Sequence, residues 1–137
     1  MFIGGEWIAS SSRFEAIDPS VGLVWTDLPQ ATPAHIDDAV ASATRAGKSW
    51  KKTSLAKRQV ILSQIADRVE ANADLWTKLL PTENGRPVRE VFIADIPATV
   101  AIFRYFAGII RDYRGDQIPV EDPNSLIYTI REQLGVI

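Results

Sequence analysis

Few side chains in this sequence are of types that do chemistry. Its 137 residues include one histidine, His35, and no cysteine. His35 follows Thr32-Pro33, a helix-start signal, so we expect an exposed histidine in a first helical turn and not a general base. Without cysteine, these residues hold no thiol nucleophile, thiolate metal site or disulfide. Glycine-rich phosphate loops are also missing. The residues themselves therefore predict no catalytic machinery.

Two carboxylates, those of Glu83 and Asp95, are candidates for a binding site. Glu83 stands just before an Asn-Gly pair, an expected helix end where free carbonyls gather, and such oxygens can coordinate a hard cation. The alternative for Glu83 is plain exposure to solvent. Asp95 stands beside Pro97 in an apolar helical stretch, where it either bonds neighbouring backbone or faces a cavity. The aromatic residues around it fit core packing better than a ligand tunnel; they are Phe92, Phe103, Tyr105 and Phe106.

Composition and charge narrow the class of protein. Apolar residues make up 46% of the chain and charged residues 23%, as in a soluble globular domain. A net charge of -2 supplies no basic surface for nucleic acid. The sequence lacks an uninterrupted apolar stretch of about 18 residues, and its N-terminus does not resemble a signal peptide. We therefore expect no nucleic-acid partner, no membrane span and a cytoplasmic location.

The N-terminal residues have the pattern of β-hairpins. Gly4-Gly5 is a two-residue turn signal between short apolar pieces. A second hairpin is expected around a turn at residues 18–22, where aspartate bonds its own backbone, proline presets φ and glycine takes positive φ. Its returning strand runs from Leu23 to Leu28.

Three amphipathic helices are expected after the hairpins. The first runs from Pro33 to about Trp50, and the second begins after the N-cap Ser54 and ends near residues 81–85. The third starts at Arg86-Pro87, is bent by Pro97 and runs to about Tyr113. The apolar stripe expected on the third helix consists of Val88, Phe92, Ile96, Val100, Phe103, Phe106, Ala107 and Ile110.

The last residues, 125–137, alternate as a strand with one buried face. Soluble domains seldom finish on an unprotected apolar edge, so we expect that Ile137 is not a natural domain end. The strands at both ends of the chain lack obvious partners, and isolated hairpins are marginal in water. They need a larger sheet or another subunit.

Six motifs occur along the chain in a fixed order. They are FIGGEW (2–7), IDPSVG (17–22), IADRVEANADL (65–75), ENGRPVREVFIADIPATVAIFRYFAG (83–108), IP (118–119) and YTIREQLGVI (128–137). Each is modest alone, but together and in register they closely resemble the beginning of an NAD(P)-dependent aldehyde dehydrogenase. The most specific part is FRYFAG followed by IP and YTIRE.

The resemblance implies an incomplete α/β fold of the aldehyde dehydrogenase type. Residues 1–115 correspond to the N-terminal part of the cofactor-binding domain. Residues 116–133 correspond to an arm that completes a sheet in a neighbouring subunit, so a homo-oligomer formed through the arm strands is implied. Residues 134–137 start a strand that leads into the nucleotide-binding region, which the sequence does not contain.

The implied activity is oxidation of an aldehyde to a carboxylic acid with NAD or NADP. In this family a cysteine thiolate attacks the aldehyde, hydride passes to the nicotinamide, and a glutamate-activated water hydrolyses the thioester. The sequence has no cysteine, and the family's catalytic glutamate and nucleotide contacts fall beyond Ile137. We therefore assign no catalytic and no cofactor-binding residue, and we expect the chain alone to be inactive.

Two sets of residues match functional positions of the family. Ile17, through its backbone carbonyl, and Glu83 match positions that bind a monovalent cation in several members, with another ligand from outside this chain. Asp95, Ala98 and Ile102 match the helix that lines the substrate entrance, where the small Ala98 leaves width.

The sequence departs from the family pattern at three positions. Arg86 replaces the usual lysine and keeps its charge, and Gln133 replaces a proline. Pro81 stands where a helix former is usual, which costs up to roughly 3 kcal/mol inside a helix. An alternative interpretation is a non-catalytic module that docks on full-length dehydrogenase subunits through its arm.

Overall fold

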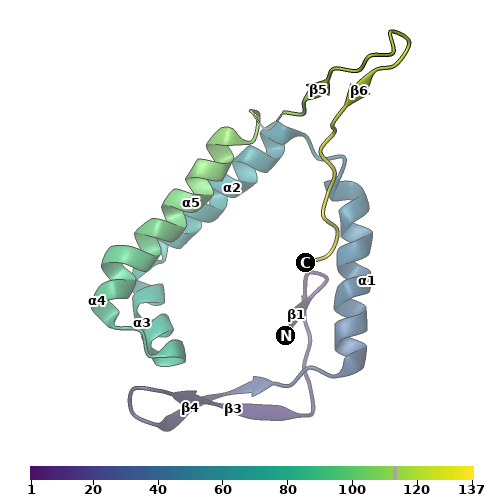
Figure 1. Ribbon diagram of the computed structural model, residues 1–137. Helices are drawn as coiled ribbons and strands as arrows, with labels where there is room; N and C mark the ends of the chain where they lie inside the picture. Colours follow the sequence, from purple (N-terminus) through teal and green to yellow (C-terminus); the bar gives the residue numbers. More distant parts are fainter. Residues whose placement is uncertain (113) are drawn as a thin grey trace.

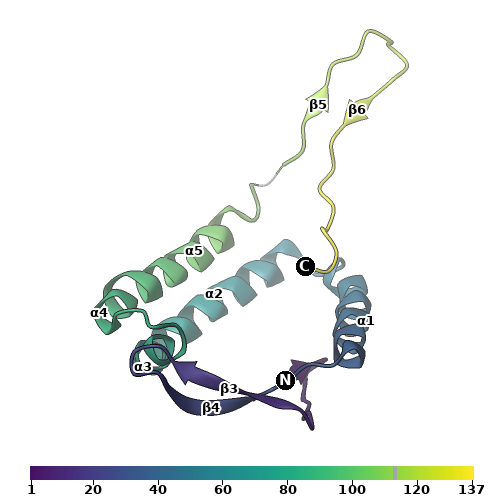
Figure 2. The same cartoon turned by 60° about the horizontal axis from the view of Figure 1, so that its bottom comes forward.

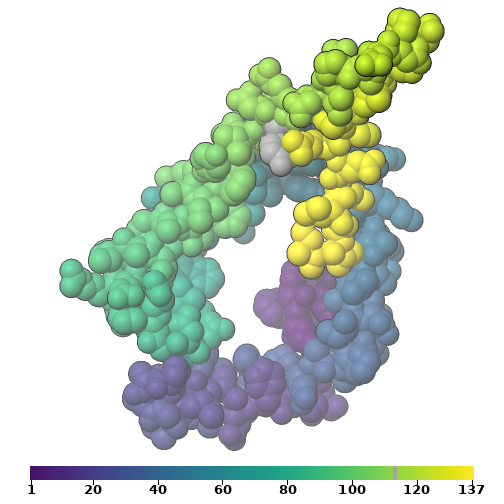
Figure 3. Space-filling view, in the orientation of Figure 1, coloured from purple at the N-terminus to yellow at the C-terminus, as the bar shows by residue number. Residues whose placement is uncertain are grey.

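The computed structural model describes residues 1–112 and 114–137. Its elements follow an open ring, with the paired helices α2 and α5 on one side and α1 on the other (Figure 1). The centre of this ring stays open when side chains are drawn at full size (Figure 3). In chain order the elements are β1 (Phe2–Ile3), β2 (Glu6–Trp7), β3 (Arg13–Asp18), β4 (Leu23–Pro29), α1 (Pro33–Trp50), α2 (Leu55–Ala71), α3 (Ala73–Asn84), α4 (Val88–Glu90), the π-helical segment η1 (Val91–Asp95), α5 (Ile96–Ile109), β5 (Gln117–Ile118) and β6 (Ile127–Tyr128).

Both N-terminal hairpins are confirmed. Gly4 and Gly5 take φ values of 64° and 95° between β1 and β2, which only glycine adopts readily. In the second turn, the Asp18 carboxylate accepts a hydrogen bond from the Ser20 backbone N–H at 2.8 Å. A bulge between Ala16 and Ile17 shifts the antiparallel register of β3 and β4. Each sheet among the described residues has only two strands.

Helix α1 begins as the sequence predicts. The His35 N–H donates to the Thr32 hydroxyl at 3.3 Å, and the Thr32 N–H donates to His35 Nδ1 at 3.2 Å. The junction with α2 is held by Arg58, whose guanidinium lies 5.2 Å from the centre of the Trp50 ring and donates to the Trp50 carbonyl at 2.9 Å. The two hydrogen bonds with Thr32 give His35 a capping role on an exposed helix end.

The second predicted helix is two helices, α2 and α3. Asn72 leaves helical geometry with φ -109° and ψ 24°, and its side chain donates to the Arg68 carbonyl at 2.8 Å. Side-chain bonds of this kind compete with the helical ladder, so the chain bends here. Pro81 does not end α3, which continues to Asn84 and closes on Gly85 in the left-handed region, φ 75°.

The third predicted helix is continuous from α4 through η1 to α5, and its predicted apolar stripe is confirmed in part, because Ile96, Val100 and Ala107 are buried. Val91 and Ile96 are both buried although they are five residues apart, because the π turn of η1 adds one residue between them. Val88 and Phe92, expected in the stripe, are each 56% exposed. The helix ends at Ile109, and its expected end at Tyr113 lies outside the described residues.

The small core lies between α2 and α5, which run side by side in two views (Figures 1 and 2). Its buried apolar residues, among those described, are Ala66, Val91, Ile96, Val100 and Ala107. The aromatic side chains expected in a core are instead exposed or half-buried, with Tyr105 61% exposed. The accessible surface is 10,896 Å², whereas a compact domain of 15.2 kDa exposes about 7,100 Å². The fold in isolation is therefore incomplete.

The composite helix Val88–Ile109 is long and apolar enough to cross a membrane, which the sequence reading did not anticipate. It has 22 residues, and its most apolar window has a mean hydropathy of 1.4 with 17% of that window buried. Length and composition alone are weak evidence for a membrane span, because core helices of soluble proteins share them. Here Arg104 pairs with Asp67 and Glu70 of α2, so one flank of the helix is bound to protein.

The C-terminal residues form less strand than predicted. Within residues 125–137, only Ile127–Tyr128 (β6) is a strand, paired with β5. Thr129 closes the base of this arm, because its hydroxyl accepts from the Asp116 N–H at 2.8 Å. Residues 134–137 have no strand partner in the described chain. The segment then returns to α1. If Gly47 of α1 carried a Cβ atom, that atom would lie 4.0 Å from Gln133 Oε1, so the two segments are neighbours.

Candidate functional site

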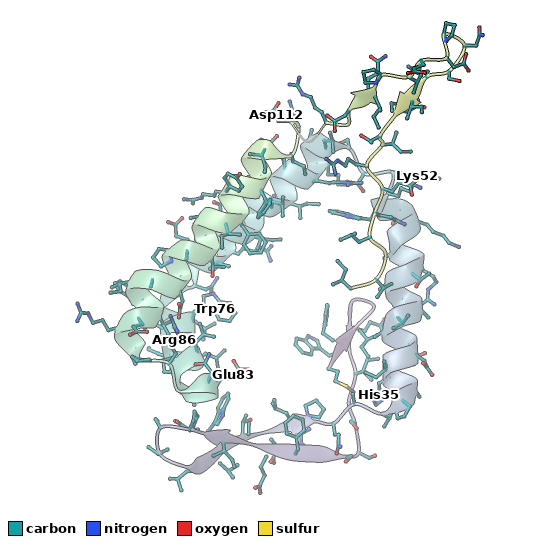
Figure 4. All side chains as sticks on the ribbon, viewed as in Figure 1. His35, Lys52, Trp76, Glu83, Arg86 and Asp112 are labelled. Atoms are coloured by element: carbon teal, nitrogen blue, oxygen red, sulfur yellow. The ribbon has the colours of Figure 1, made fainter. Side chains whose placement is uncertain are left out.

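The loop after α3 sets the geometry of the candidate site. The Gly85 N–H donates to the Pro81 carbonyl at 2.8 Å, and the Arg86 N–H donates to Asn84 Oδ1 at 2.9 Å. A Cβ on Gly85 would lie 3.0 Å from Pro19 Cγ, so this loop touches the turn of the β3–β4 hairpin. Its positive φ favours glycine here, and a Cβ would also press on the Pro19 ring. Figure 4 shows Glu83, Arg86 and Trp76 gathered at this end of the helical layer.

The two residues predicted to bind a monovalent cation lie on neighbouring elements. Ile17 is in β3 and Glu83 is in α3, and these elements are in contact. Glu83 is exposed and makes no ion pair with the described residues. No group of three or more histidine, cysteine, aspartate or glutamate side chains that could hold a metal ion is found among the described residues. Hard cations take more than two oxygen ligands. Ile17 and Glu83 are therefore compatible with part of a cation site and do not complete one.

Asp95 faces a depression and is also paired. Its carboxylate accepts a hydrogen bond from Arg86 Nε, and its side chain is 30% exposed. Its backbone carbonyl accepts from the Thr99 hydroxyl at 2.7 Å. The open depression beside it measures about 140 Å³. The depression is lined by Val69, Trp76, Leu80, Asp95, Ile96 and Thr99.

Ala98 and Ile102 lie one helical turn apart on α5, and both are exposed. They do not line the depression that Asp95 lines. The five-residue step from Val91 to Ile96 explains their exposure. In an uninterrupted α-helix, Val91 would share its buried side with Asp95 and Ile102, four and eleven residues later. The π turn gives that side to Ile96 and leaves the three predicted entrance residues accessible.

Arg86 is the member of this site that sequence reasoning missed. In the sequence it is only a replacement that keeps a positive charge, yet in the structure it holds Asp95 nine residues away. Its Nη2 also lies 3.7 Å from Glu90 Oε2. The pKa of Arg86 is raised, first by the hydrogen bond to Asp95 and then by the charge of Asp95. The pairing depends on the loop and on the π turn, and no regular sequence spacing signals it.

One buried polar atom in the depression lacks a partner. Trp76 Nε1 is shielded from solvent and has no hydrogen-bond acceptor among the described residues. Buried donors are ordinarily paired, so an acceptor from outside the described residues fits this position. The sequence gives no sign of this, because Trp76 reads as one more member of an apolar stripe.

Comparison with known proteins identifies the kind of enzyme to which this arrangement corresponds. The model of the aldehyde dehydrogenase family matches residues 7–137. A long-chain-aldehyde dehydrogenase from Acinetobacter sp is 40% identical over 99% of this chain, which spans 27% of that relative. The crystal structure of succinate-semialdehyde dehydrogenase from Burkholderia pseudomallei superposes with a TM-score of 0.89 and 31% identity over 98% of this chain and 28% of that one.

A second solved structure adds a cofactor complex to the comparison. PnpE in complex with nicotinamide adenine dinucleotide superposes with a TM-score of 0.85 and 32% identity, over 93% of this chain and 26% of that one. The chain thus spans about a quarter of the length of the relatives it matches. On the family match and these superpositions, the chain belongs to the aldehyde dehydrogenase family.

Proposed function

We propose that these residues are the N-terminal part of an enzyme that oxidises an aldehyde to its carboxylic acid with NAD or NADP in the cytoplasm. The family match over residues 7–137 carries the proposal. The sequence contains no cysteine, so the thiolate that such a reaction uses comes from residues outside this chain. We propose accordingly that the chain alone is inactive.

Within that enzyme, we assign three roles to this chain: it lines the substrate entrance, holds part of a cation site and contributes to oligomerisation. The exposed positions of Ala98 and Ile102 and the depression beside Asp95 support a role for these residues at the substrate entrance. The contact between β3 and α3 supports a monovalent cation held in part by Ile17 and Glu83. The exposed two-stranded arm, β5 and β6, supports homo-oligomerisation by strand pairing.

The experiment compares two proteins made from the native gene. One is residues 1–137, and the other is the longest product of the same reading frame. We expect aldehyde-dependent formation of NADH or NADPH, with the carboxylic acid as product, from the longer protein alone. Oxidation by residues 1–137 would contradict the assignment of the nucleophile to other residues. Failure of a longer product that carries a cysteine would contradict the activity.

The exposed apolar surface also suits a module that docks on full-length dehydrogenase subunits. The excess of accessible surface over that of a compact domain favours this second candidate, because such surface becomes stable when covered. Co-elution of residues 1–137 with a catalytic subunit from the native source would support docking. A monodisperse free monomer in the presence of that subunit would count against it.

A further inference from the structure

Charge is separated along the sequence in a way that the net value of -2 conceals. Residues 39–66 carry six of the 15 lysine and arginine residues and none of the 17 aspartates and glutamates. They span the second part of α1, the turn after it and most of α2. Such a stretch in an acidic chain makes a local positive field that attracts anionic partners. Its cations are Arg45, Lys48, Lys51, Lys52, Lys57 and Arg58.

Arg58 fixes the turn between α1 and α2 and uses its donors there. Its guanidinium donates to the backbone carbonyls of Trp50 at 2.9 Å, Thr53 at 3.1 Å and Lys51 at 3.3 Å. The other five cations are exposed and make no ion pair with the described residues. The turn is therefore a fixed base from which flexible cationic side chains project. We call these five residues the basic corner: Arg45, Lys48, Lys51, Lys52 and Lys57.

The basic corner lies on the outer side of the ring. Figure 4 shows Lys52 where α1 passes into α2, pointing away from the open centre. On α1, Gly47 faces the C-terminal segment. Arg45, two residues earlier, lies on the opposite side of the helix, because each residue turns it by about 100°. Further residues that fill the open centre are therefore compatible with an accessible basic corner.

Helix stability explains only part of the basic corner. Lys48 complements the negative C-terminal end of the α1 dipole. Lys57 does the reverse, because it lies in the first turn of α2, where its N–H donates to the Ser54 hydroxyl at 3.3 Å. A glutamate at that position would complete a capping box and favour the positive end of the helix. A lysine there opposes the dipole, which points to a role outside the fold.

We propose that the basic corner binds an anionic lipid surface, so that the protein attaches peripherally to membranes. This goes beyond the proposed function and does not depend on the oxidation of aldehydes. Four of the five cations are lysines, whose long side chains can set compact charges on a flat array of lipid phosphates. The neighbouring Trp50 ring lies 5.2 Å from the Arg58 guanidinium and is not a free stacking platform for nucleic-acid bases.

The test measures sedimentation of the complete protein that carries residues 1–137 with lipid vesicles. The vesicles contain equal parts of phosphatidylcholine and phosphatidylglycerol, and the reference vesicles are pure phosphatidylcholine. We expect binding to the anionic vesicles alone. High salt should abolish it, because the Debye length falls from about 10 Å at 0.1 M to about 3 Å at 1 M. Equal binding to both kinds of vesicle, or binding to neither, would overturn the proposal.

Lysine variants test whether the corner itself is responsible. The triple variant Lys48→Gln, Lys51→Gln, Lys52→Gln should lower the partition coefficient about 100-fold, since each basic residue near an anionic surface contributes about fivefold. Replacing the same three lysines with arginine keeps the charge and should keep binding. Unchanged binding in the glutamine variant would contradict the proposal.

Two comparisons separate the basic corner from folding and from net charge. Lys57→Glu should weaken vesicle binding about 25-fold through two units of charge, although its carboxylate favours the start of α2. Loss of binding in this variant therefore cannot come from a weakened helix. The matched control for net charge changes three exposed residues outside the corner: Arg68→Gln, Lys78→Gln and Arg89→Gln.

The outcomes separate this proposal from its alternatives. A control variant that loses as much binding as the lysine variant would overturn it, because net charge would then be sufficient. Unchanged binding in Lys57→Glu would also overturn it. Tighter binding to a DNA duplex than to the anionic vesicles would replace the lipid surface with nucleic acid. A protein that binds the vesicles through the corner but oxidises no aldehyde would refute the proposed function alone.

Discussion

Replacing Val91 with alanine should weaken the packing of η1 against α3. Val91 is fully buried, and it is the largest side chain so buried among the described residues. The change removes two methyl groups, worth about 1.6 kcal/mol in transfer free energy, and the cavity left behind brings the loss to about 2–3 kcal/mol. In the complete dehydrogenase that carries residues 1–137, this loss should appear as a lower melting temperature in far-UV circular dichroism.

The control is the same change at Val60, which lies on α2 and is 53% exposed. Its replacement by alanine should cost less than about 0.5 kcal/mol, because little apolar surface is lost from a packed site. Equal destabilisation by the two variants would refute the assignment of Val91 to the packed core. So would an unchanged melting temperature for Val91→Ala.

Three further predictions concern single positions. Pro81→Ala should raise the free energy of unfolding by up to about 3 kcal/mol in urea titration, because proline removes a helical N–H inside α3; an unchanged midpoint would contradict this. Gly115→Ala should open the base of the β5–β6 arm, because a Cβ there would lie 2.0 Å from the Thr129 carbonyl oxygen; amide exchange at Thr129 should accelerate, and unaltered protection would count against it. The pKa of Asp18 is lowered from 3.8, first by the hydrogen bond from the Ser20 hydroxyl. Its contribution to stability should therefore be present above the unfolded pKa and disappear as pH falls through the lower folded one; a titration in which Asp18→Asn shows the same acid dependence would refute this.

Local backbone chemistry was predictable from the sequence. The turns at Gly4-Gly5 and at Asp18 and the cap at Thr32 depend on residues within a few positions of one another. Gly85 ends its helix for the same reason, since its left-handed φ of 75° is a property of that residue type. These features need no knowledge of distant contacts.

The departures arise where single residues interrupt the regular helical periodicity. Asn72 breaks a pattern that reads as one helix, through a side-chain bond to the backbone four residues earlier. The π turn of η1 inserts one residue into the apolar stripe, so counting by threes and fours from Ile96 assigns Phe92 to the wrong face. Sequence periodicity gives no sign of such an insertion.

The candidate site was predictable only in outline. The resemblance placed Asp95, Ala98 and Ile102 at an entrance, and the structure leaves Ala98 and Ile102 exposed and Asp95 part-exposed beside a depression. The resemblance gave no indication that Arg86 compensates Asp95, because an ion pair across a loop and a π turn has no regular spacing. The cation pair, Ile17 and Glu83, stays a prediction.

The central claim is that these residues work as the first part of a longer aldehyde dehydrogenase. The most direct measurement is the intact mass of the protein purified from its native source, read together with the peptide sequence that follows Ile137. The account predicts a mass several times the 15.2 kDa of this chain, with a cysteine in the additional residues. A native protein of 15.2 kDa that ends at Ile137 would contradict it.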